Sequence, residues 1–259
     1  SGTVTVTDSS MSANQASKGG ALYVNSGTLT LIASTLARNV ALADGGAIFN
    51  LTRVVLTQSR VTENSANVNG AGVYNQGLIT SATSTFQLNN ATREGGAVYN
   101  AGTLTMTQSA IIQNRAGAGG GGLRNGNSAA LFLENSTVGD NSTDGSGGGI
   151  HNTGAVDARF VTIYENLAST GGMDIFNQPA AGKSFNVFAT IVARPSSNNR
   201  IVCSGAPLAA ASPGYNLISD SSCGLAAATA LIQLHDLTPG KADSPPYYMP
   251  VAVQNNPVL

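Results

Sequence analysis

The chain has 259 residues, a formal net charge of −1, 10% charged residues and 42% hydrophobic residues. This balance excludes a disordered polyelectrolyte, because there is enough apolar side chain to form a packed core. It also predicts no nucleic-acid partner, since no basic stripe is present to neutralise phosphates. No apolar run approaches the roughly 18 residues that span a bilayer, so we expect no direct membrane insertion.

The first predicted element, at 3–7, has the sequence TVTVT, in which threonine alternates with valine. The same alternation returns at 28–35 (TLTLIAST) and at 103–109 (TLTMTQS). A period of two in β-branched and aliphatic residues predicts half-buried β-strands. Because these short segments are separated by Gly, Asn and Ser, we predict an all-β chain without helices.

Two series of asparagines run through these segments, and the second trails the first by the same offset in every repeat. The first series is Asn14, Asn39, Asn64, Asn89, Asn114, Asn141 and Asn166. The second series is Asn25, Asn50, Asn75, Asn100, Asn125, Asn152 and Asn177. The step is constant within each series, except for one longer step that starts from Asn114 and from Asn125. The period and the strand content predict a β-solenoid of about 25 residues per coil with about three strands per coil.

Stacking of equivalent residues explains why asparagine recurs. Successive coils of a solenoid lie about 4.8 Å apart, so an inward asparagine can hydrogen-bond with the asparagines above and below it. We therefore predict two structural amide ladders, and we expect their asparagines to provide the left-handed backbone that sharp corners need. A serine column accompanies the first ladder and ends at Val161, and the Gly-rich segment Gly117–Leu123 is predicted to be a lengthened turn.

The register of the repeat weakens near residue 180. We assign 1–179 to regular coils and 180–259 to irregular C-terminal coils and a cap, all in one domain. The only two cysteines, Cys203 and Cys223, lie in the second part and suggest a disulfide formed in an oxidising compartment, with two buried free thiols as the alternative. Because the chain opens directly on a strand pattern, we expect it to derive from a longer precursor.

The motifs GGAIFN (45–50), GGAVYN (95–100) and TLTMTQSAIIQN (103–114) resemble the repeats of chlamydial polymorphic outer-membrane proteins. The chain is also similar to bacterial surface proteins that carry a choice-of-anchor Q domain, in its repeats, in the tail CSGAPLAAASPGYNLISDSSCG (203–224) and in the final NNPVL. The resemblance covers nearly the whole chain. It implies a right-handed, single-stranded parallel β-helix at an extracellular bacterial surface, and it supplies no catalytic residues.

A column of side chains directly before the second asparagine series is the candidate binding site. If its neighbours face inward, alternation turns this column outward, where it could stack on sugars or pack against a partner protein. The alternative is an aromatic ladder that only stabilises strand stacking. In the first coil either Val24 or Tyr23 occupies this position. The later members are Phe49, Tyr74, Tyr99, Arg124, His151 and Phe176.

Acidic residues offer an enzymatic alternative. Asp140 and Glu165 share one column, and Asp157 and Arg159 lie on a neighbouring predicted strand. Paired carboxylates could process a polysaccharide as a lyase, hydrolase or epimerase, or could bind Ca²⁺. We favour a solvated charged face, because exposed charge needs no special cause. The two histidines, His151 and His235, have no zinc-site spacing. We therefore predict no catalytic residues, no metal site and no cofactor.

The predicted function is that of a structural or adhesive module of an extracellular bacterial surface protein. Its repeated side-chain ladders would bind a glycan, a surface protein or further copies of the chain. Many weak contacts along a rigid axis gain affinity from high effective concentration. The alternatives are a polysaccharide-processing enzyme and a subunit that forms filaments or a sheath.

Overall fold

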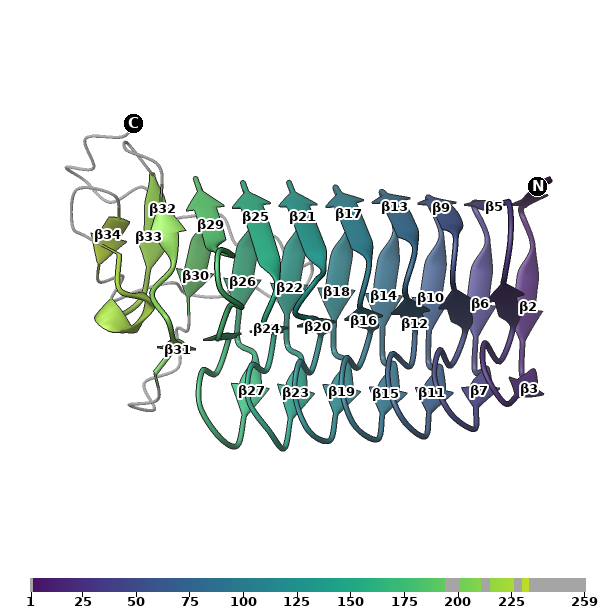
Figure 1. Ribbon diagram of the computed structural model, residues 1–259, viewed down its shortest axis with the longest axis horizontal. Coiled ribbons are helices and arrows are strands. Elements are labelled where there is room, and N and C mark those ends of the chain that lie inside the picture. Colours follow the sequence, from purple (N-terminus) through teal and green to yellow (C-terminus); the bar gives the residue numbers. More distant parts are fainter. Residues whose placement is uncertain (1, 194–200, 211–214, 226–229, 233–259) are drawn as a thin grey trace, which may run out of the picture.

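The computed structural model describes residues 2–193, 201–210, 215–225 and 230–232. The chain winds into successive coils, and equivalent strands of these coils form long rows with the N-terminus at one end (Figure 1). The strands pair in parallel, and in the first pair each residue of Thr3–Thr7 lies opposite its counterpart one coil later in Thr28–Ile32. The prediction of an all-β parallel β-helix is confirmed.

Four parallel sheets run along the helix. Sheet A contains β1 (Thr3–Thr7), β5 (Thr28–Ile32), β9 (Arg53–Thr57), β13 (Leu78–Ala82), β17 (Thr103–Thr107), β21 (Ala130–Glu134), β25 (Ala155–Arg159), β29 (Phe185–Phe188) and β32 (Ala209–Ala210). Sheet B contains β2 (Ser10–Ser12), β6 (Thr35–Ala37), β10 (Arg60–Thr62), β14 (Thr85–Gln87), β18 (Ala110–Ile112), β22 (Thr137–Gly139), β26 (Thr162–Tyr164), β30 (Ile191–Ala193), β33 (Asn216–Ile218) and β34 (Ala230–Ile232).

The other two sheets are built from shorter strands. Sheet C contains β3 (Gln15–Ala16), β7 (Val40–Ala41), β11 (Ser65–Ala66), β15 (Asn90–Ala91), β19 (Arg115–Ala116), β23 (Ser142–Thr143) and β27 (Leu167–Ala168). Sheet D contains β4 (Leu22–Val24), β8 (Ile48–Asn50), β12 (Val73–Asn75), β16 (Val98–Asn100), β20 (Leu123–Asn125), β24 (Ile150–Asn152), β28 (Ile175–Asn177) and β31 (Cys203–Gly205). Each regular coil thus has four strands, not the predicted three, because the alanine segment pairs as a strand of its own.

The alternating sequences place one apolar core inside the coils. In β5, Leu29 and Leu31 are buried, whereas the threonines between and before them stay partly exposed. The central residue of each sheet B strand from β6 to β30 is apolar and buried, such as Leu36, Val61 and Phe86. The repeat therefore adds the same core layer with every coil, and each layer is covered by the next.

The first asparagine ladder is present as predicted. Nδ2 of Asn39 donates to Oδ1 of Asn64 at 3.0 Å, and the backbone N–H of Asn39 donates to the same oxygen at 2.9 Å. The second hydrogen of Nδ2 is donated to the carbonyl of Met11 at 3.0 Å. The hydrogen bond between the side-chain amides recurs at every step from Asn14 to Asn166. Each buried amide in the middle of the ladder is thereby satisfied by its own copies and by a backbone carbonyl.

The second ladder joins Asn50 to Asn75 at 2.8 Å and continues step by step to Asn177. Asn25 does not belong to it. Val24 is buried opposite Asn50, and Asn25 is exposed in the following turn. The reason is a shift of register by one position: β4 pairs Leu22 with Ile48, whereas the neighbouring strands of sheet A keep the regular period of the repeat.

The corners are built differently from the prediction. None of the ladder asparagines has a positive φ. The left-handed residue is the one before the ladder position, as at Arg38 (φ 55°), Glu63 (φ 56°) and Leu88 (φ 56°). A left-handed residue turns its side chain outward, so that the next residue can point inward. Residues before the serine column do the same, as at Gln58 (φ 50°) and Thr83 (φ 48°).

The one longer step of the repeat, after Asn114 and Asn125, also has a different origin from the one predicted. β19 and β20 are separated by the same number of residues as β15 and β16, so Gly117–Leu123 is not lengthened. The two additional residues lie in the turn 126–129, between β20 and β21. This turn is held by a hydrogen bond from the N–H of Ala129 to the carbonyl of Gly126 at 3.0 Å.

The C-terminal coils have lost sheet C, which ends at β27 in the described part of the chain. Cys203 and Cys223 form a disulfide, with Cα atoms 4.8 Å apart, so the alternative of free thiols is wrong. Cys223 ends the 3-10 helix η1 (Ser221–Cys223), whose N-terminus is capped by Asp220. The predicted cap beyond residue 232 lies outside the described residues. No helix in the described ranges is both long and apolar enough to cross a membrane.

Candidate functional site

The predicted aromatic column lies on the outer face of sheet D. Tyr23 pairs with Phe49, which settles the first coil in favour of Tyr23 over Val24. The column continues in register through Tyr74, Tyr99, Arg124, His151 and Phe176. The structure therefore brings all the predicted members onto one line parallel to the helix axis.

Four aromatic rings of this column stack face to face. Ring centroids are 5.1 Å apart for Tyr23 and Phe49, and 5.0 Å apart for the two following pairs, with interplanar angles of 4–5°. The ring faces of Phe49 and Tyr74 are therefore covered by their neighbours, and Phe49 is only 3% exposed. Stacking on a sugar needs a free ring face, so this geometry favours the stabilising ladder over sugar stacking.

Beyond Tyr99 the column continues with two polar residues, Arg124 and His151, before it returns to an aromatic ring at Phe176. Nε of Arg124 pairs with the carboxylate of Glu94 at 3.1 Å, and Nη1 donates to the hydroxyl of Thr153 at 3.0 Å. Burial raises the pKa of Tyr99, and the nearby Glu94 adds to this increase. Burial also lowers the pKa of His151 to about 4, with a further contribution from Arg124. The His151 ring packs edge-on against Phe176, with centroids 4.8 Å apart.

The acidic residues of the enzymatic alternative occupy two different places. Asp140 and Glu165 lie at the corner between sheets B and C, both with positive φ. The hydroxyl of Tyr164 donates to Asp140 at 3.3 Å, and partial burial raises the pKa of Asp140. Asp157 instead lies on the outer face of sheet A, where both of its oxygens accept hydrogen bonds from Arg159 at 3.0 Å. Asp157 lines two surface cavities, whereas Asp140 and Glu165 line neither of them.

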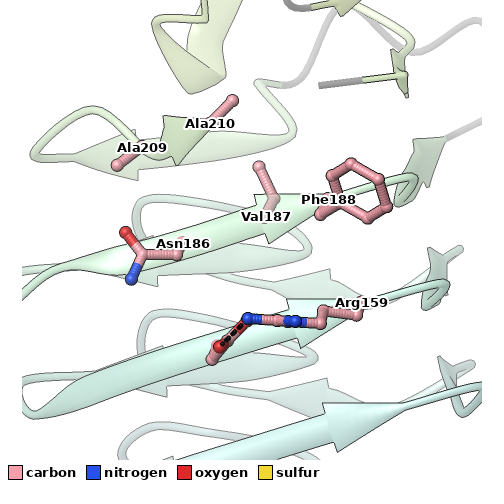
Figure 2. Close-up of a pocket in the computed structure, with 7 residues that line it drawn as sticks. Arg159, Asn186, Val187, Phe188, Ala209 and Ala210 are labelled. Carbon is pink, nitrogen blue, oxygen red and sulfur yellow. Dashed lines mark hydrogen bonds and ion pairs between the residues drawn. The ribbon is translucent and has the colours of Figure 1, made fainter. Parts of the chain in front are cut away.

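A groove on the outer face of sheet A includes two of these residues, Asp157 and Arg159. One cavity of about 510 Å³ lies over β25, β29 and β32, and its walls include Asp157, Arg159, Asn186 and Phe188 (Figure 2). A second cavity of about 210 Å³ lies over β17, β21 and β25. The two cavities adjoin each other, because Asp157 and Arg159 line both. We call this feature the sheet A groove and define it by Phe132, Glu134, Asp157, Arg159, Asn186 and Phe188.

Exposed aromatic rings border the sheet A groove. Phe132 is 44% exposed in the second cavity. Phe188 lies edge-on to Phe160 at 5.6 Å and to Tyr215 at 6.1 Å, and both of these partners are 52% exposed. Exposed apolar clusters of this kind often mark binding surfaces.

The sequence prediction missed most of the groove. Thr30, Val55, Thr80 and Thr105 precede Phe132, Asp157 and Asn186 in one outward column. A search for regular columns selects positions that repeat, whereas this site is marked by positions where a small residue is replaced. The signal was therefore present in the sequence as a departure from the repeat.

No three His, Cys, Asp or Glu side chains gather as a metal site within the described ranges. A third surface depression, of about 370 Å³, lies between Tyr99, Arg124 and the turn 126–129.

No family model, curated protein or solved structure matches the chain.

Proposed function

We propose that this chain is a structural and adhesive module of an extracellular bacterial surface protein, of the kind that its repeats resemble. It acts as a stiff rod that holds binding surfaces at fixed spacing along one axis. Its targets are a glycan, a surface protein or further copies of the chain. The proposal includes no catalytic step and no cofactor.

The observation that carries the proposal is the continuous locking of each coil onto the next. The two ladders connect buried amides over five or six consecutive steps, and the stacked rings of sheet D add a third connection. Eight spacings between the nine strands of sheet A give a rod about 38 Å long. A rod of fixed register suits multivalent contact, because it cannot shorten the distance between its sites.

The disulfide supports an extracellular location, since such bonds persist in oxidising compartments. The dispersal of the acidic residues supports a binding role over polysaccharide cleavage. Asp140 and Glu165 lie away from the groove, and Asp157 is engaged by Arg159 in a two-bond ion pair.

Bead adhesion tests the proposal directly. Beads carrying the chain at rising density are passed over surfaces coated with individual polysaccharides, matrix proteins or the chain itself. We expect retention on at least one surface to rise more steeply than the density, as multivalent contact requires. Absence of retention on every surface would contradict adhesion.

The alternatives are distinguished with the same materials. Release of new reducing ends from a polysaccharide, abolished by Asp140→Asn or Glu165→Gln, would establish the enzyme and overturn the proposal. Scattering intensity that grows with concentration would favour the filament-forming subunit.

A further inference from the structure

We propose that the sheet A groove binds an extended, neutral oligosaccharide. This inference rests on the proposed adhesive function and assigns it a site and a ligand class. The groove crosses the strands of sheet A and therefore runs along the rod axis, as the strands carrying Arg159, Asn186 and Ala209 show (Figure 2).

The dimensions of the groove suit a linear chain of sugars. It extends from β17 to β32, which is four spacings between strands. At about 4.8 Å per spacing this is a length of about 19 Å. The spacing is close to the length of one pyranose ring along an extended glycan, so successive rings can face successive coils. The groove then accommodates on the order of four sugars.

The chemistry of the lining matches hydroxyl groups next to apolar ring faces. Glu134 and Asn186 are exposed, and the Arg159 side chain is 60% exposed, so the groove offers both hydrogen-bond donors and acceptors. Arg159 uses two of its nitrogens for Asp157 and retains further N–H donors for a ligand. The ring of Phe132 lies opposite Asp157 on the adjacent strand and offers an apolar surface beside these polar groups.

The charge of the groove selects a neutral ligand. Its lining holds the carboxylates of Glu134 and Asp157 but only one guanidinium, that of Arg159. A polyuronate or a sulfated glycan would meet an excess of negative charge, which repels it. A protein partner is disfavoured as well, because charged residues are depleted from the centre of protein interfaces and here they occupy it.

The repeat provides an internal comparison for this assignment. In coils nearer the N-terminus the same outward column carries Thr30, Val55 and Thr80. These positions lie in the same parallel pairing of sheet A, but they carry no ring and no charge. The change to Phe132, Asp157 and Asn186 is therefore not required by the fold.

Calorimetric titration of the full chain tests the site. The probes are three neutral linear hexasaccharides, of β-linked glucose, xylose and N-acetylglucosamine, and hexagalacturonate as the anionic counterpart. We expect at least one neutral probe to bind with a higher affinity than hexagalacturonate. Phe132→Ala and Arg159→Ala should each weaken this binding at least about tenfold, as the loss of an anchor does.

Matched controls come from the same sheet. Thr80→Ala, in the column of Phe132, and Arg53→Ala, an arginine at the start of β9, should change the affinity less than about twofold. Phe132→Tyr should retain binding, which shows that the ring and not the fold is responsible.

Three outcomes would overturn the inference: no binding of any neutral probe, tighter binding of hexagalacturonate, or equal loss in the control variants. If beads adhere but the hexasaccharides do not bind, the inference fails and the adhesive function stands. If a hexasaccharide binds in the groove but beads are not retained, the groove is correct and the adhesive function fails.

Discussion

The regular coils and the C-terminal coils provide hydrogen-bond partners for their buried polar groups in different ways. Up to Asn177, a buried amide is satisfied by the same amide one coil further on. The first ladder ends at Asn166, whose Nδ2 donates to the carboxylate of Asp174 at 2.7 Å. The second ladder ends on backbone, where Asn177 donates to the carbonyl of Ala206 at 3.0 Å.

Beyond the ladders, individual contacts replace repetition. The N–H of Val202 donates to Asp220 at 3.1 Å, and the N–H of Cys203 donates to the hydroxyl of Ser222 at 2.9 Å. A disulfide joins the same segments. A repeat needs one solution that serves every coil, whereas an end needs a separate partner for each polar atom. The sheet A groove begins in regular coils and reaches this end, where outward positions have departed from the repeat.

The largest expected effect is at the centre of the first ladder. Asn89→Ala removes the acceptor of two bonds from Asn64, and thereby leaves the buried backbone N–H of Asn64 without its acceptor. It also removes the donor Nδ2 that serves the carbonyl of Val61 and Oδ1 of Asn114, although Oδ1 of Asn114 keeps the bond from the backbone N–H of residue 89. We expect a loss of about 4 kcal/mol in the free energy of unfolding, because the groups that lose a partner stay buried. Urea denaturation measures it.

The control is Asn14→Ala at the exposed end of the same ladder. It loses a single side-chain bond to Asn39, so the cost should stay below about 1 kcal/mol. Equal costs at the two positions would show that position within the ladder is irrelevant.

Removal of the disulfide should affect only the C-terminal coils. The bond closes a loop of 20 residues, so replacing both Cys203 and Cys223 by alanine should cost about 3 kcal/mol there. Coils of a solenoid contact only their neighbours, and therefore β9 and β13 should remain protected. Hydrogen exchange should accelerate in β31 and β33. An equal acceleration in β9 would contradict the division into two regions.

Low pH should lower the stability of the protein through His151, a member of the sheet D column. Its pKa falls from 6.5 to about 4 on folding, so the fold favours the neutral ring. The contribution to stability is complete above about pH 6.5 and is lost as the pH falls towards 4, with a total on the order of 2 kcal/mol after allowance for partial exposure. Urea midpoints for the wild type and for His151→Phe measure the difference.

The phenylalanine variant keeps a ring in the column, as at Phe176, but cannot be protonated. Its stability should fall less than that of the wild type between these two pH values. If the stabilities of the two proteins fell in parallel with decreasing pH, His151 would be excluded as the cause of the acid destabilisation.

The smallest effect is expected in the stacked rings. Tyr74→Leu keeps an apolar side chain but loses ring contacts on both sides, which should cost about 1 kcal/mol. Tyr23→Leu, at the end of the stack with one ring neighbour, should cost about half as much. Thermal denaturation compares the two variants. A larger loss for Tyr23→Leu would contradict the role of stacking.

The sequence predicted the fold closely, because every coil repeats the same constraint. Spacing alone identified the ladders from Asn39 to Asn166, since a buried amide must recur at each coil. It could not place Val24 and Asn25, because two compensating changes of loop length leave the period of the repeat intact while the strand pairing shifts. The number of residues between asparagines reports only the length of the chain in each coil, whereas the backbone hydrogen bonds determine which residues of neighbouring strands pair.

The site was less predictable for a related reason. Asp157 and Arg159 were selected by charge, but their grouping with Asp140 failed because a corner of the coil separates sheet A from that position. Phe132, Asn186 and Phe188 were missed since they break columns, and a single replaced residue carries no periodic signal.

The central claim is that ladder amides lock the coils together. Residue-resolved hydrogen exchange tests it at the backbone N–H of Asn39, Asn64 and Asn89, each of which donates to the side chain of the next ladder asparagine. We predict that these three amides exchange at one common slow rate, set by unfolding of the whole regular region, and more slowly than those of β33. Exchange at these asparagines as fast as in the exposed turns would contradict the claim.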